Sequence, residues 1–182
     1  QYWNEALSLF VKIQDKERIA GVHRKMGSVL WDNMGETEKA KVHHTESLKI
    51  LETEPKSIEL ARLNEDMGLM YLATGDVTKA LSWTEKALDL AKELNTLEVV
   101  ASSYATLGAI LPETGDVKKS VECLERALRI ALDNNYVETA LRAYDFLGWT
   151  LPVEEYVQIR LENDEKGYEL AKKVGAVHHQ SS

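Results

Sequence analysis

Few residues in this chain have side chains that could do chemistry. Cys123 is the single cysteine, and two histidine pairs, His43-His44 and His178-His179, carry the imidazoles that a zinc site uses. Neighbouring residues on a helix point about 100° apart, and no cysteine or carboxylate completes a ligand spacing. We therefore expect plain surface histidines and no metal. The position of Cys123 on an apolar helical pattern predicts a buried thiol.

Acidic pairs are the other candidates for acid–base work. Glu154 and Glu155 fall in a predicted turn or helix start, where capping and solvation explain them better. The sequence also has no GxxxxGK[ST], no GxGxxG after a strand, no HExxH and no GxSxG. We therefore predict no catalytic residue and no cofactor, and we do not expect an enzyme.

The composition favours a folded, all-α chain. The 182 residues are 44% hydrophobic, with only three prolines and ten glycines, and most of the rest are good helix formers. The net charge of −8 disfavours direct binding to nucleic acid or to an anionic membrane. No run approaches the roughly 20 apolar residues of a membrane-spanning helix, and no signal-peptide pattern is present. These features predict a cytoplasmic location.

Glycines recur in this sequence with a fixed period. One series is spaced by 41, 40 and 40 residues and a second by 40 and 40. The first series is Gly27, Gly68, Gly108 and Gly148, and the second is Gly35, Gly75 and Gly115. The segments between them also match, because residues 67–76 resemble 107–116 and residues 83–91 resemble 123–131. A period of this length is typical of stacked helical repeats.

Each unit contains two helical patterns, and the two glycine series have different roles in them. Glycines of the second series can adopt the left-handed conformation that ends a helix, and Asp76 or Asp116 can cap the next one. Glycines of the first series lie inside helices, where glycine costs about 1 kcal/mol relative to alanine. We attribute them to two helix backbones that approach too closely for a larger side chain. The small residues of the partner helix are Ala80, Ala87 and Ala127.

Taken together, these residues resemble the tetratricopeptide repeat family, in a variant with about forty residues per unit. The family pattern has Leu-Gly, a Tyr three residues later, a turn Gly and two spaced alanines. The best copy here is Met67, Gly68, Tyr71, Gly75, Ala80 and Ala87. The resemblance covers nearly the whole chain and implies an all-α solenoid of antiparallel helix hairpins with about nine helices.

The same register divides the chain into repeats within a single domain, residues 1–182. Residues 1–15 match the second helix of a truncated repeat. Three full repeats follow over 16–55, 56–95 and 96–135, then a degenerate or capping repeat over 136–175 and a tail over 176–182. Because the chain opens inside an amphipathic helix, we expect a segment of a larger protein.

The resemblance implies that the first helix of each repeat lines a concave binding face. In the family, the positions three before and one after the motif glycine look into that face, and a rim lies six before it. These positions are Arg24, Ser28, Arg62, Glu65, Leu69, Ser102, Ala105, Ala109, Arg142, Asp145 and Trp149. The pairs Arg24 with Ser28 and Glu65 with Leu69 lack the lysines and asparagines of a carboxylate-binding clamp, so capture of a C-terminal carboxylate is disfavoured.

Two functional hypotheses from different classes stay open. The first is a non-catalytic scaffold that binds a peptide or a partner domain in its concave groove, as part of signal transduction. The second is a regulatory, sensor or oligomerisation arm of a larger signalling ATPase, cyclase or transcription regulator, acting on other domains of the same chain. A homo-oligomer formed through exposed terminal repeats belongs to this second class. The identity of the partner is not encoded in the repeat pattern.

Overall fold

The computed structural model describes residues 2–149, 151 and 153–175, and over these residues the chain is all-α. Nine α-helices and one short 3₁₀ helix follow one another there without a strand. The predicted all-α solenoid with about nine helices is therefore confirmed. The helices fall into two compact units, residues Gln1–Thr96 and Leu97–Ser182.

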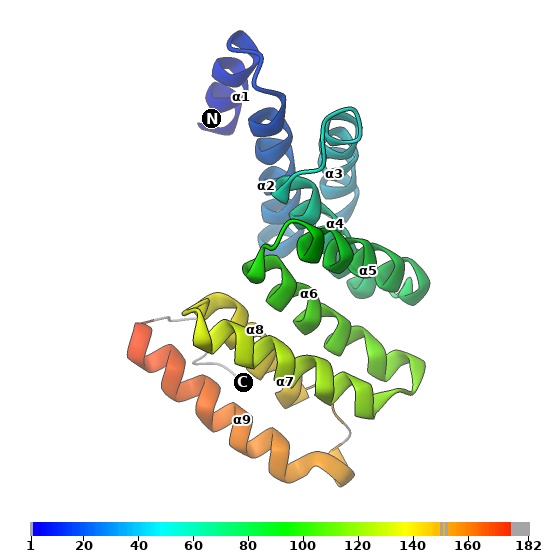
Figure 1. The fold of residues 1–182 in the computed structure, drawn as a ribbon, viewed down its shortest axis with the longest axis vertical. Coiled ribbons are helices and arrows are strands. Elements are labelled where there is room, and N and C mark those ends of the chain that lie inside the picture. Colours follow the sequence, from blue (N-terminus) through cyan, green and yellow to red (C-terminus); the bar gives the residue numbers. More distant parts are fainter. Residues whose placement is uncertain (1, 150, 152, 176–182) are drawn as a thin grey trace. The chain divides into compact units, whose positions relative to one another are not determined.

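The first unit contains five helices arranged as successive antiparallel neighbours (Figure 1). They are α1 (Tyr2–Lys12), α2 (Lys16–Met34), α3 (Thr37–Leu51), α4 (Ile58–Ala73) and α5 (Val77–Glu93). The helix α2 packs along α3, and α4 packs along α5. Because α2 also contacts α4, the first helices of the two hairpins are neighbours.

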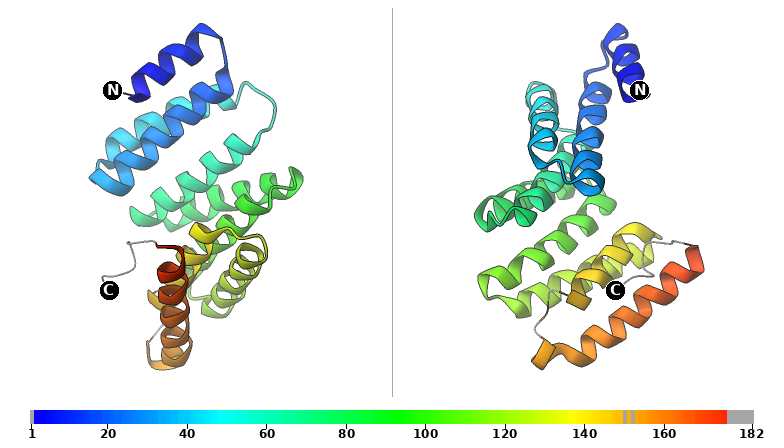
Figure 2. Two further views of the ribbon diagram at one scale, coloured as in Figure 1. Left: turned by 90° about the vertical axis from the view of Figure 1, so that its left-hand side faces the viewer. Right: turned by 180° about the vertical axis from the view of Figure 1, so that it is seen from behind.

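The second unit repeats the arrangement with two further hairpins (Figure 2). Its elements are α6 (Leu97–Ile110), the 3₁₀ helix η1 (Leu111–Thr114), α7 (Val117–Asp133), α8 (Val137–Trp149) and α9 (Val153–Val174). The helix α6 pairs with α7, α8 pairs with α9, and α6 contacts α8. The helix α6 ends at Ile110 because Pro112 has no N–H to continue the α-helical ladder, and the chain tightens into η1.

The turns inside the hairpins use backbone that favours glycine. Gly35, Gly75 and Gly115 have φ of 63°, 79° and 83°. The next residue in the second and third hairpins caps the following helix: the N–H of Lys79 donates to Asp76 at 3.1 Å, and the N–H of Lys119 donates to Asp116 at 3.2 Å. Asn95 and Asn135 take the same left-handed conformation in the longer joints between hairpins, with φ of 54° and 58°.

The glycines inside the first helices lie where two helices touch. A methyl group on the α-carbon of Gly27, Gly68, Gly108 or Gly148 would overlap a side chain of the partner helix. The atoms it would meet belong, in the same order, to His44, Thr84, Leu124 and Asp164. The facing residue thus lies 16 or 17 positions after each glycine.

The alanines of the partner helix do not face the glycine directly, but they also allow the two helices to pack closely. Ala80, Ala87 and Ala127 are fully buried. The carbonyl oxygen of Ala40, the first-hairpin counterpart of Ala80, would lie 3.1 Å from a methyl on Gly27. At the same position of the third hairpin, the hydroxyl of Ser120 donates to the carbonyl of Gly108 at 2.5 Å. Small residues at this position bring the backbone of one helix within reach of the other.

The apolar core of the first unit lies between its hairpins. Its fully buried members include Leu51 from α3 and Leu63 from α4, packed against Ala20 and Met67. Trp83 packs on the edge of this cluster, with the Lys86 ammonium 4.3 Å above its ring. Stacking of one hairpin on the next therefore buries the faces that a single hairpin would leave exposed.

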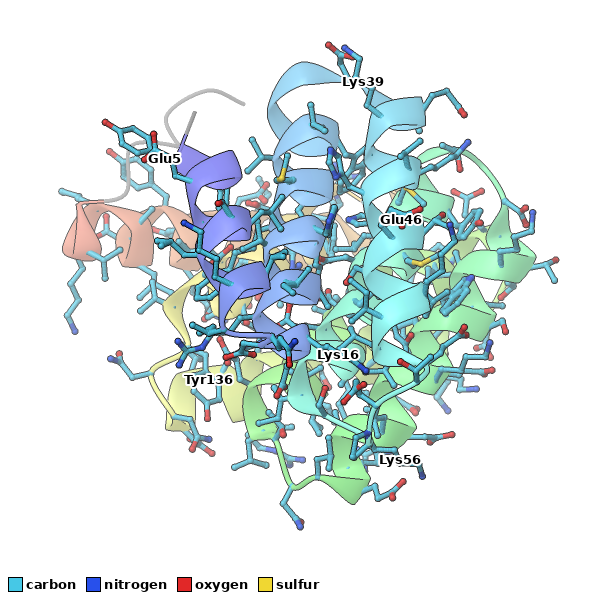
Figure 3. All side chains as sticks on the ribbon, turned by 90° about the horizontal axis from the view of Figure 1, so that it is seen from above. Glu5, Lys16, Lys39, Glu46, Lys56 and Tyr136 are labelled. Atoms are coloured by element: carbon cyan, nitrogen blue, oxygen red, sulfur yellow. The ribbon has the colours of Figure 1, made fainter. Side chains whose placement is uncertain are left out.

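Equivalent surface ion pairs recur at one end of the hairpins in the first unit. Lys16, which opens α2, lies 2.6 Å from Glu54 beyond the end of α3. Lys56, just before α4, lies 2.6 Å from Glu93 at the end of α5; both lysines are labelled in Figure 3. These pairs are well exposed, so each contributes less than about 1 kcal/mol.

The glycine contacts predict a difference between two otherwise similar substitutions. In Gly27→Ala, the new methyl meets the buried ring of His44 and the Ala40 carbonyl, so overpacking of about 1–3 kcal/mol outweighs the gain of about 1 kcal/mol in helix propensity. In Gly148→Ala, the methyl meets the exposed carboxylate of Asp164, which can swing into solvent. Urea unfolding should show Gly27→Ala destabilised and Gly148→Ala unchanged or more stable; equal losses would contradict the packing account.

Candidate functional site

Within the first unit, the predicted groove residues come from two neighbouring helices. Arg24 and Ser28 lie on α2, and Arg62, Glu65 and Leu69 lie on α4. Since α2 contacts α4, the structure brings these two groups onto adjacent first helices. All of these side chains are half-buried or buried rather than freely solvated.

Arg24 and Ser28 are joined to α4 through two carboxylates. The guanidinium Nε of Arg24 donates to Glu59 at 2.5 Å, and its Nη1 donates to Asp66 at 2.8 Å. The hydroxyl of Ser28 donates to the same Asp66 oxygen at 2.7 Å. We call this set of Arg24, Ser28, Glu59 and Asp66 the α2–α4 ion network.

The network is largely shielded from water. The side chains of Arg24, Glu59 and Asp66 are 12%, 14% and 16% exposed. Burial alone would lower the pKa of Arg24, but the Asp66 and Glu59 carboxylates raise it above its ordinary value, so the guanidinium stays charged. A shielded guanidinium that bridges two carboxylates fixes both the spacing and the register of α2 and α4.

Sequence reasoning found two members of this network and missed the other two. Glu59 lies in the first turn of α4, and Asp66 lies two residues before the motif Gly68. The equivalent of Asp66 is Thr106 in the third repeat, so this carboxylate has no counterpart there that a repeat pattern could reveal.

The other predicted groove residues of α4 differ in accessibility. Glu65 is buried, with 7% of its surface exposed, whereas Arg62 and Leu69 are half-buried. The accessible part of the predicted face on α4 is therefore the pair Arg62 and Leu69. Glu65 is part of the interior of the fold in this conformation.

In the second unit the predicted residues lie on α6 and α8, which are also neighbours. Ser102, Ala105 and Ala109 on α6 are buried, and Arg142 and Asp145 on α8 are half-buried. Trp149 ends α8, but its side chain lies outside the part of the structure that is described. The assignment of these residues to a binding groove stays a prediction.

The histidines of the first unit correct one expectation. His44 is not a surface residue: it is 1% exposed, its ring faces Gly27, and burial lowers its pKa. Its neighbour His43 turns to α2, where its Nδ1 lies 3.1 Å from the Nδ1 of His23. Adjacent positions on α3 thus point in different directions, as helix geometry requires. The pair of His23 and His43, 20 residues apart, gave no signal in the sequence. His178 and His179 lie outside the described residues.

The other residues considered for chemistry are Cys123 and the acidic pair Glu154 and Glu155. The predicted burial of Cys123 is confirmed, and that burial raises the pKa of its thiol, which makes it a poor nucleophile at neutral pH. The side chains of Glu154 and Glu155 lie outside the described part of the chain. Over the described residues, no helix is long and apolar enough to cross a membrane.

The helical hairpins and their periodic glycines can be compared with known proteins. A family model described as tetratricopeptide repeat matches residues 18–93 and again residues 59–133. Together these matches span more than half of the chain. The chain belongs to the tetratricopeptide repeat family. Members of this family are generally protein-interaction modules without catalytic activity.

Solved structures share the same repeat fold. The crystal structure of aspartyl phosphate phosphatase F from Bacillus subtilis matches with a TM-score of 0.77 at 17% identity, over 98% of this chain and 46% of that one. The crystal structure of BtubC (BKLC) from P. vanneervenii matches with a TM-score of 0.72 at 19% identity, over 99% of this chain and 74% of that one.

These similarities concern the fold alone, because both identities are low. This tetratricopeptide repeat chain spans less than half the length of the phosphatase that it matches. No curated protein matches it in sequence.

The α2–α4 ion network predicts a large loss of stability when its centre is removed. Arg24→Met keeps most of the side-chain length but leaves Glu59 and Asp66 shielded without their cation, which should cost about 3 kcal/mol in the free energy of unfolding. The matched control is Lys16→Met, which removes an exposed ion pair and should cost less than about 1 kcal/mol. Equal losses in the two variants, measured by urea unfolding, would show that the network does not hold α2 to α4.

Proposed function

We propose that this chain is a non-catalytic scaffold that binds a peptide or a partner domain on the faces formed by its first helices. In the first unit this face belongs to α2 and α4, and in the second unit to α6 and α8. The observation that carries the proposal is the direct contact of first helix with first helix in both units of a tetratricopeptide repeat protein.

The physical advantage of such a scaffold is preorganisation. The α2–α4 ion network and the close-packed glycines limit the movement of the helices before a partner arrives. A partner therefore loses its own conformational freedom on binding, while the scaffold loses little. This mechanism needs no reacting group in the chain.

The side chains of the α2–α4 face indicate the chemistry of the partner. Arg24 forms ion pairs with Glu59 and Asp66, so these residues give the face a fixed polar surface rather than a strong net charge. Arg62 and Leu69 offer a partly accessible cation and a partly accessible apolar group. We infer a partner segment with an apolar side chain that packs on Leu69 and on the accessible part of Arg62, in keeping with the hot-spot role of arginine at interfaces.

We also propose that this interaction takes place in the cytoplasm and serves signal transduction. The support for this placement is the buried free thiol of Cys123, which suits a reducing compartment, and the binding role that the family implies. Neither statement depends on the identity of the partner.

A peptide selection tests the binding face whatever the identity of the natural partner. Random peptides displayed on phage would be selected on the purified chain, and the affinities of the enriched peptides would be measured by fluorescence anisotropy. The double variant Arg62→Ala/Leu69→Ala should weaken binding at least tenfold, because both changes remove accessible groups of the α2–α4 face.

The matched control is Arg129→Ala/Leu132→Ala, which removes the same two residue types from exposed positions of α7. This variant should change the affinity less than twofold. Equal losses in both variants, or unchanged binding in the first, would exclude the α2–α4 face as the binding site. Enrichment of no peptide, together with concentration-dependent mass of the chain alone, would favour an oligomerisation arm.

A further inference from the structure

Three of the five histidines in the chain lie in its first hairpin. His23 is on α2, and His43 and His44 are adjacent on α3. The later hairpins, over residues 58–174, contain no histidine. Histidine is the side chain whose charge changes between about pH 5 and 8. The first hairpin therefore differs from the others in the number of protons that it can bind near neutral pH.

The ring of His44 is enclosed between α2 and α3. It is 1% exposed, and two of its atoms lie where a methyl group on Gly27 would be. Among the described residues, neither ring nitrogen has a hydrogen-bond partner. A neutral imidazole tolerates such surroundings at a modest cost, whereas a buried imidazolium without a hydrogen bond is strongly disfavoured. The folded hairpin thus disfavours a proton that the unfolded chain binds below about pH 6.5.

The charged groups around His44 do not reverse this effect. Burial is the largest influence on the ring, and the net result is a pKa below its ordinary value. The Asp66 carboxylate of α4 and the backbone of Arg24 act in the opposite direction, whereas the Arg24 guanidinium on α2 and the imidazole of His43 lower the pKa further. Asp66 also already accepts hydrogen bonds from Arg24 and Ser28 in the α2–α4 ion network.

His23 and His43 form a hydrogen-bonded pair across the same hairpin. Their Nδ1 atoms are 3.1 Å apart, and their ring centroids are 5.3 Å apart. A hydrogen bond between two nitrogens needs one donor and one acceptor, but both nitrogens of a protonated imidazole are donors. The pair therefore accepts one added proton, whereas a second proton would break the hydrogen bond and bring two positive charges together.

The carboxylate beside this pair does not offset its resistance to a second proton. Burial and His43 lower the pKa of His23, and they outweigh the Glu46 carboxylate of α3, which raises it. Glu46, labelled in Figure 3, forms an ion pair with Lys49 at 2.7 Å. Three protons can bind to these histidines in the unfolded chain, whereas only one is readily accommodated in the folded hairpin.

We propose that the three histidines make the first hairpin an acid-sensitive element of the fold, in which α3 detaches from α2 as the pH falls below about 6.5. Because the folded state binds fewer protons than the unfolded state, its stability is fully present above that pH and declines below it. Each proton that the folded state excludes raises the opening equilibrium constant by up to about tenfold between pH 7.5 and pH 5.5. This behaviour belongs to the hairpin itself and is independent of any partner.

Hydrogen exchange of the whole chain at pH 7.5 and pH 5.5 tests this proposal, with rates corrected for intrinsic exchange at each pH. The opening equilibrium constant of α3 should rise at least tenfold between the two pH values. That of α7, in a hairpin without histidine, should change less than threefold. His44→Thr and His44→Leu should each reduce the rise in α3 at least threefold. Thr84 and Leu124 occupy the equivalent position in the next two hairpins, so both side-chain types are compatible with this packing.

His23→Gln should reduce the rise at least twofold, because glutamine can hydrogen-bond to His43 without titrating. The matched control is Thr84→Ala, which weakens the equivalent buried contact of the second hairpin without removing a titratable group. It should leave the pH dependence of α3 unchanged within twofold. Circular dichroism at pH 7.5 shows whether each variant is folded.

Three outcomes would overturn the proposal. They are a rise of less than tenfold in α3 of the unmodified chain, an equal rise in α7, and a rise in α3 that persists undiminished in both His44 variants. If neither His44 variant folds, an undiminished rise in His23→Gln overturns the proposal instead.

Discussion

The close approach of two helices inside each hairpin is the constraint on which the rest of the structure depends. A glycine in the first helix meets a side chain that lies 16 or 17 residues later, and in the first three hairpins a small residue one turn before that side chain lets the backbones come together. The facing side chain varies from His44 to Thr84, Leu124 and Asp164. In the first three hairpins a methyl at the glycine would overlap a buried side chain of the partner helix, whereas in the fourth it would meet the exposed carboxylate of Asp164, which can move aside.

Tight hairpins place their first helices side by side, and this placement creates the candidate binding face. In the first unit α2 and α4 are also tied by a shielded guanidinium that bridges two carboxylates. Breaking such a pair is costly, so the face is rigid where α2 meets α4. Rigidity and accessibility are divided between residues: Arg24 holds the helices together, whereas Arg62 and Leu69 stay partly accessible to a partner.

Periodicity made most of the fold predictable, since the spacing of glycines and apolar residues is local and repeats. The helix count, the all-α class and the burial of Cys123 follow from that pattern. The repeat pattern could not predict contacts that occur only once in the chain. Glu59 and Asp66 reach Arg24 across two helices, His23 meets His43 across a hairpin, and His44 is buried because its first-hairpin position faces Gly27. None of these residues recurs at the equivalent position of the other repeats.

Hydrogen exchange measured by mass spectrometry, with and without a peptide that binds the chain, tests most directly whether the first helices form the binding face. The account predicts slower exchange on binding within residues 16–34 and 58–73, which are α2 and α4, and little change within residues 37–51 and 77–93, which are α3 and α5. Protection confined to α3 and α5 would contradict it, because the partner would then lie on the second helices.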